Sequence, residues 1–161
     1  FTRAQGRDVI FRGIAVPGFP GISNKEGTNN IFFGKYAGYN NTNGNENINI
    51  GTDAGYYNKT GINNILIGDK AGYGSSGNNI SKNIMIGSNV GKNSTGSHNI
   101  FMGSSDSIGS GVGISTTGEK NIFIGSNVGI ENTSGQKNIF IGIKNETSPI
   151  DWSIKSEITL P

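Results

Sequence analysis

The apolar residues of this chain follow a short pattern that recurs seven times. Each copy has the form Asn-Ile-x-(Ile/Phe/Met)-Gly, and we number its positions from the Asn as position zero. The copies begin at Asn30, Asn47, Asn64, Asn83, Asn99, Asn121 and Asn138. The steps between them are 17, 17, 19, 16, 22 and 17 residues. A near-constant period of this size is typical of stacked repeats, in which every copy forms one structural unit.

A second pattern, Gly-x-x-(Ala/Val)-Gly, follows most copies and predicts where each strand ends. It occurs at Gly34–Gly38, Gly51–Gly55, Gly68–Gly72, Gly87–Gly91 and Gly125–Gly129. Glycine adopts backbone conformations that other residues resist, so both of its glycines mark corners. Frequent glycine also argues against helices. The sequence therefore predicts an all-β fold, a β-solenoid or β-roll of about seven short rungs, with successive strands about 4.8 Å apart.

The alternation of side chains along a strand predicts which positions face the inside of each coil. Position one is Ile in every copy, and position three is Ile, Phe or Met. Because alternate side chains share a face, we expect positions one and three to line the interior, where β-branched residues pack well. We expect the Asn at position zero to form a ladder, each side-chain amide bonding to its copies in the neighbouring coils. The alternative is that this Asn only begins a turn.

Position two then points outward, and in six of seven copies it is large and apolar. These residues are Phe32, Leu66, Met85, Phe101, Phe123 and Phe140, with Asn49 as the exception. An apolar stripe of this length marks an interaction surface, and closed symmetry is usual for assemblies of identical chains. We therefore expect these six residues to form the interface of a parallel homotrimer, intertwined or side by side. The alternative is that position two packs under loops of its own chain.

Composition and charge narrow the function classes only a little. The chain of 161 residues holds 23 Asn and 27 Gly, has no Cys, and carries a net charge of +2. Without Cys it can form neither a disulfide nor a thiolate metal site. No dense basic patch follows the three Arg near the start, so we expect no nucleic-acid partner. No apolar run is long enough to span a membrane as a helix, so we expect no membrane insertion.

The ends and one long interval depart from the repeat. We expect residues 1–26 to cap the first rung or to link to another domain, 27–142 to form the solenoid, and 143–161 to cap the other end or connect onward. The 22-residue step places extra residues after Gly103, and insertions in solenoids form loops on one face. Either this loop contacts a receptor or its length is neutral, and Trp152 is either a sugar-stacking platform or a capping residue. The receptor-binding candidates are Ser104, Ser105, Asp106, Ser107 and Trp152.

Catalytic and metal-binding patterns are thin. His98 is the only His, and the eleven acidic residues occupy no repeated position. We therefore expect no enzyme activity, no metal and no cofactor. Carboxylates paired between subunits, as glycoside cleavage requires, stay open as an alternative.

The Asn-Ile-x-Ile-Gly-x-x-Ala-Gly repeats, with linkers such as Asn41-Thr42-Asn43-Gly44, resemble two families over about residues 27–142. They are similar to the head repeats of trimeric autotransporter adhesins and, more closely, to related repeats of bacteriophage tail-fibre proteins. The period here is longer than that of the adhesin heads. The resemblance implies a homotrimeric β-roll or β-prism used in attachment.

Together these observations favour a structural attachment fibre segment, located outside the cell on a virion tail fibre or a bacterial surface. Its partners would be two sister chains and a cell-surface glycan or protein receptor. Two alternatives remain: a monomeric solenoid that binds a repeating surface such as ice, and a tailspike-like glycan hydrolase.

Overall fold

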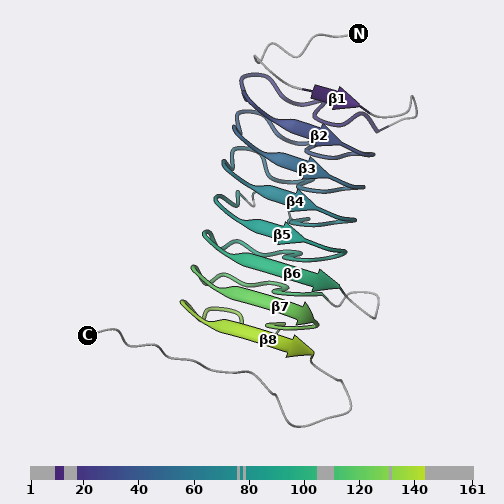
Figure 1. The fold of residues 1–161 in the computed structure, drawn as a ribbon. Helices are drawn as coiled ribbons and strands as arrows, with labels where there is room; N and C mark the ends of the chain where they lie inside the picture. Colours follow the sequence, from purple (N-terminus) through teal and green to yellow (C-terminus); the bar gives the residue numbers. More distant parts are fainter. Residues whose placement is uncertain are drawn as a thin grey trace.

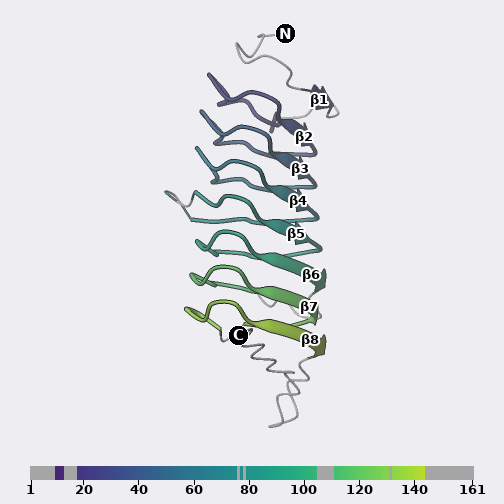
Figure 2. The same ribbon diagram turned by 60° about the vertical axis from the view of Figure 1, so that its left-hand side comes forward.

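Short parallel strands, one per coil, build the fold. The computed structural model describes residues 10–12, 18–75, 77, 79–104, 111–130 and 132–143. The strands are β1 (Ile10–Arg12), β2 (Ile31–Phe33), β3 (Ile48–Ile50), β4 (Ile65–Ile67), β5 (Ile84–Ile86), β6 (Ile100–Ser104), β7 (Ile122–Ser126) and β8 (Ile139–Ile143). They form one sheet in sequence order, stacked as Figure 1 shows, and Figure 2 shows the rest of each coil returning on one side of that sheet. No helix occurs among these residues, so the predicted all-β solenoid is confirmed.

The register of the sheet follows the sequence repeat. Ile48 of β3 pairs with Ile65 of β4, one repeat later. The long step of 22 residues does not shift this register, because Ile100 still pairs with Ile122. The insertion therefore leaves the pairing of β6 with β7 in step with the repeat.

The interior of the coils is lined by position two, which is opposite to the expectation from sequence. In β2–β8 the side chains at position two that are fully buried within the single chain are Phe32, Asn49, Leu66, Met85, Phe101 and Phe123. Phe140 packs against the same core and is partly buried. The prediction that Phe32, Leu66, Met85, Phe101, Phe123 and Phe140 face outward is wrong, and the trimer interface assigned to them does not hold. These side chains pack instead in the core of their own chain.

Small residues after the strand explain how a 17-residue coil encloses a phenyl ring. A Cβ added to Gly129, where φ is +72°, would lie 2.5 Å from the ring of Phe123. The Ala or Val between the two corner glycines also points inward, and Val128 is among the buried residues. In β6, β7 and β8 the rings at position two stack, with centroids 4.8 Å apart for Phe101 and Phe123 and 4.9 Å apart for Phe123 and Phe140. A thin coil is therefore filled by one large side chain per rung.

The Asn at position zero forms the predicted ladder. The Nδ2 of Asn64 donates to Oδ1 of Asn47 at 2.8 Å and to the carbonyl oxygen of Ile80 at 2.8 Å. Its Oδ1 accepts from the backbone N–H of Asn83 at 3.1 Å. The backbone N–H of Asn138 likewise donates to Oδ1 of Asn121, so the ladder continues to the last strand. Each amide thus connects neighbouring coils and satisfies backbone groups inside the solenoid.

The ladder also accounts for the reversed faces. Positions zero and two lie on the same side of a strand because side chains alternate with a period of two. A buried Asn at position zero therefore requires position two to be buried as well. Positions one and three, with their nearly constant Ile, must then lie on the outside of the sheet.

The sheet begins before the predicted repeat boundary at residue 27. Strand β1 pairs with β2 in parallel, although the segment around it lacks the repeat pattern. Residues after it already bond to the next coil, since the N–H of Gly21 donates to the carbonyl oxygen of Ala37 at 2.9 Å. The first coil therefore lacks the sequence signature while keeping the coil-to-coil contacts.

Candidate functional site

The outer sheet face carries an unbroken array of apolar side chains. We define this face as positions one and three of β2–β8. Its members are Ile31, Phe33, Ile48, Ile50, Ile65, Ile67, Ile84, Ile86, Ile100, Met102, Ile122, Ile124, Ile139 and Ile141. Phe33 is 53% exposed and Ile141 is 52% exposed, while most of the Ile side chains between them are half-buried. No polar or charged residue interrupts the two columns.

The dimensions of the outer sheet face follow from strand geometry. Six steps of about 4.8 Å separate β2 from β8, and three residues extend about 10 Å along a strand, so its footprint is on the order of 300 Å². An apolar patch of that size is comparable to the largest found on a typical monomer, which is often functional. The outer sheet face is therefore the first candidate site.

A second candidate is a group of aromatic side chains outside the sheet. All five tyrosines of the chain lie together on three successive coils, in the segments that follow β2, β3 and β4. We call this group the tyrosine cluster. Its members are Tyr36, Tyr39, Tyr56, Tyr57 and Tyr73. All five are half-buried, so part of each ring reaches the surface.

The rings of the tyrosine cluster contact one another in a continuous chain. Tyr39 and Tyr56 stack with centroids 5.1 Å apart and planes 12° apart, and Tyr73 continues the row at 5.6 Å from Tyr56. Tyr36 stands at 82° to Tyr39, and Tyr57 stands at 75° to Tyr73. The cluster therefore combines a row of rings that repeats with the coils and two steeply inclined rings beside it.

The hydroxyl groups of Tyr56 and Tyr73 stay protonated at neutral pH. Burial is the largest cause that raises the pKa of Tyr56, and the neighbouring Tyr57 adds to it. Burial also raises the pKa of Tyr73, followed by a side-chain hydrogen bond with Tyr57. These phenols can therefore donate hydrogen bonds to a ligand across the physiological range.

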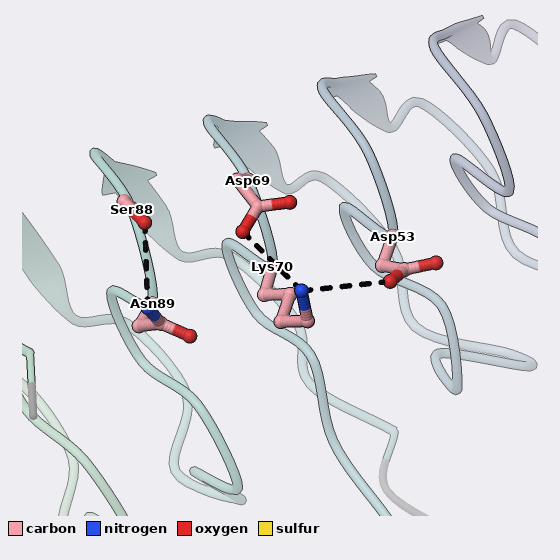
Figure 3. A network of polar contacts seen from close by, with 5 residues as sticks. All are labelled: Asp53, Asp69, Lys70, Ser88 and Asn89. Carbon is pink, nitrogen blue, oxygen red and sulfur yellow. Dashed lines mark hydrogen bonds and ion pairs between the residues drawn. The ribbon is translucent and has the colours of Figure 1, made fainter. Parts of the chain in front are cut away.

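Charged side chains occupy the same turn segments. Figure 3 shows Lys70 between two carboxylates, with its Nζ 3.9 Å from Oδ2 of Asp53 and 3.3 Å from Oδ2 of Asp69. Burial raises the pKa of Asp53 more than Lys70 lowers it. On the first of these coils, Nζ of Lys35 lies 5.1 Å from the centroid of the Tyr36 ring. The tyrosine cluster thus has carboxylates and ammonium groups nearby.

The receptor-binding candidates from sequence are only partly placed. Ser104 ends β6 and is exposed. Ser105, Asp106, Ser107 and Trp152 lie outside the described residues, so their assignment stays a prediction.

Sequence reasoning missed the tyrosine cluster, although a signal was available. Position nine of the unit is Tyr39, Tyr56 and Tyr73 in three consecutive copies. In later coils the same place is taken by Lys92, Ile114 and Ile130, as the bonds between neighbouring coils show. Aligning the copies beyond position eight would have shown a column of Tyr confined to one part of the rod.

Comparison with known proteins adds no family to this picture. No family model, no curated protein and no solved structure matches the chain. In the part of the chain that the structure describes, no helix is long and apolar enough to cross a membrane. Over the same residues, no group of three or more His, Cys, Asp or Glu side chains could hold a metal ion.

Proposed function

We propose that this chain is a structural segment of an attachment fibre in which parallel copies pack their outer sheet faces against one another, three around a common axis. The observation that carries the proposal is the uninterrupted apolar array on that face. Burying such an array releases water from apolar surface, which is the main driving force for association. The receptor would be a cell-surface glycan or protein, and the fibre would belong to a virion tail or a bacterial surface.

A second copy of the chain is the partner that fits this face best. The two columns repeat at the coil spacing over seven strands, so parallel copies can match coil for coil along their whole length. A second copy of the chain has the same coil-to-coil spacing because its sequence is identical. An unrelated partner would match that spacing only by coincidence. Closed symmetry then covers the face on every copy and prevents open-ended association.

The solenoid also suits a load-bearing role. Neighbouring coils are joined by backbone hydrogen bonds in the turns as well as in the sheet, for example Gly55 N–H to the Ala71 carbonyl at 2.9 Å. The Asn ladder adds bonds through the interior. Such a rod holds side chains at fixed positions along its length. Binding to ice through a flat row of Thr finds no support on the outer sheet face, which carries only Ile, Phe and Met.

A charge placed on the outer sheet face tests the assembly. Ile67→Asp puts a carboxylate in the middle of the apolar columns, where burial without a partner is costly. Thr52→Asp is the matched control, because Thr52 is exposed, lies one coil away and is not part of the sheet. We expect Ile67→Asp to convert the assembly to single chains in light scattering, and Thr52→Asp to leave it intact. Equal masses for the two variants would argue against this interface.

A further inference from the structure

We propose that the tyrosine cluster is a binding site for a neutral, extended saccharide chain lying along the rod. This deepens the attachment role proposed above by naming a receptor class, and it rests on that role only for its biological use. The site lies on turn segments outside the sheet, so it is a different surface from the outer sheet face.

The tyrosine cluster is not required by the coil architecture. Ile114 and Ile130 occupy position nine in lower coils, which fold with the same coil-to-coil bonding. All the tyrosines of the chain are nevertheless concentrated on three adjacent coils. The fold accepts Ile at position nine, yet Tyr occurs there only on coils that carry other Tyr side chains. This distribution indicates that the rings act together as one surface.

The chemistry of the tyrosine cluster matches a sugar. The C–H groups on one face of a pyranose ring carry partial positive charge and pack on the negative face of an aromatic ring. Because Tyr39 and Tyr56 stack along the rod, the steep planes of Tyr36 and Tyr57 run along the stack and offer faces parallel to it. Phenol hydroxyls and nearby carboxylates then serve the sugar hydroxyls as donors and acceptors.

The spacing of the row agrees with a polymeric ligand. The ring centroids repeat at 5.1 Å from Tyr39 to Tyr56 and at 5.6 Å from Tyr56 to Tyr73. This repeat is close to the length of one pyranose unit in an extended chain. One sugar unit per coil can therefore meet the edge and hydroxyl of an equivalent ring beside the faces of Tyr36 and Tyr57, and several weak contacts add up along the rod.

The other classes of polymer fit less well. Lys35 and Lys70 lie beside the rings together with Asp53 and Asp69, so these four side chains offer no net positive charge to attract phosphate groups or acidic sugars. A peptide that binds as an added strand needs free backbone groups. In these coils such groups are engaged, for example Asn40 N–H with the Tyr56 carbonyl at 3.0 Å and Asn93 N–H with the Tyr73 carbonyl at 2.8 Å.

Binding to defined sugars tests the inference. The full chain, in its native assembly, is titrated with maltohexaose, cellohexaose, xylohexaose and chitohexaose, and binding is followed by saturation-transfer NMR and calorimetry. We expect at least one hexasaccharide to bind, with the strongest saturation on C–H protons of the sugar faces. Replacing Tyr39, Tyr56 and Tyr73 together by Ile should weaken it at least tenfold, since one aromatic contact accounts for a factor of about two to ten.

Two controls keep the outcome interpretable. The triple variant should fold, because Ile is the residue found at this position in the coils that follow β6 and β7. Tyr57→Ala removes a flanking ring and is an independent test of the same site. Ile114→Ala and Ile130→Ala, at the matching position, should leave sugar binding unchanged. The inference is overturned if no hexasaccharide binds, or if the triple variant and Tyr57→Ala both bind as tightly as the wild type.

The same samples separate this inference from the proposed assembly. Ile67→Asp keeps the tyrosine cluster intact, so a dissociated variant that still binds sugar supports the site alone. An intact assembly that binds no sugar overturns the site while leaving the fibre interface standing.

Discussion

Truncating Phe123 tests whether position two fills the core of the coil. The ring is fully buried and lies between the rings of Phe101 and Phe140, at centroid distances of 4.8 and 4.9 Å. Phe→Ala in a packed core costs about 3 to 5 kcal/mol through lost apolar burial and the remaining cavity. Because Phe123 also loses two stacking partners, we expect Phe123→Ala to lower the free energy of unfolding by about 4 kcal/mol. That is roughly a thousandfold change in the folding equilibrium.

Urea unfolding followed by circular dichroism measures this loss. Phe19→Ala is the control, because Phe19 is 57% exposed and the same truncation there should cost less than about 1 kcal/mol. The loss at Phe123 should appear at every protein concentration, since the contacts lie within one chain, whereas a loss at an interface between chains depends on concentration. A cost at Phe123 no larger than that at Phe19 would refute the placement of position two inside the coil.

Three further predictions concern polar groups of the coils. Asn49→Leu should raise the free energy of unfolding, measured in urea, by about 1 to 2 kcal/mol. The reason is that Asn49 is fully buried and its Oδ1 has no hydrogen-bond partner in the structure. An unchanged or lower stability would contradict this. Asn64→Ala should lower it by about 3 kcal/mol, since the ladder loses bonds to Asn47, Ile80 and Asn83; a loss below about 1 kcal/mol would count against the ladder. Burial raises the folded pKa of Asp53, so the folded state binds its proton more tightly than the unfolded state. The contribution of Asp53 to stability should therefore fall as pH rises through and above 3.8, and Asp53→Asn should remove that slope from thermal unfolding measured against pH.

The repeat itself was predictable from the sequence, and its orientation was not deduced correctly. The period, the parallel rungs and the Asn ladder follow from the spacing of Asn30 and its six copies. The assignment of faces failed because invariant Ile at position one was taken as a sign of burial. Alternation alone gives two equivalent solutions, and only the buried Asn on the same side as position two distinguishes them. The near-constant Ile on the outside is instead consistent with the proposed contact between chains.

The two surfaces differ in how far the sequence could reveal them. The outer sheet face follows from the repeat as soon as the faces are assigned correctly. The tyrosine cluster includes Tyr36 and Tyr57, which occupy different positions of the unit. Each contacts a ring of the next coil, Tyr36 with Tyr56 and Tyr57 with Tyr73, and these contacts depend on the register of neighbouring coils. Exact placement of those rings depends on side-chain packing at a corner, which a repeat pattern does not encode.

The native mass of the unmodified chain tests the central claim that sister chains cover the outer sheet face. The chain mass is 16.9 kDa, so light scattering should give about 51 kDa for three copies. Dilution or Ile67→Asp should shift that mass toward the single chain. A mass of 16.9 kDa at every concentration would leave the Ile columns in water and contradict the proposed fibre.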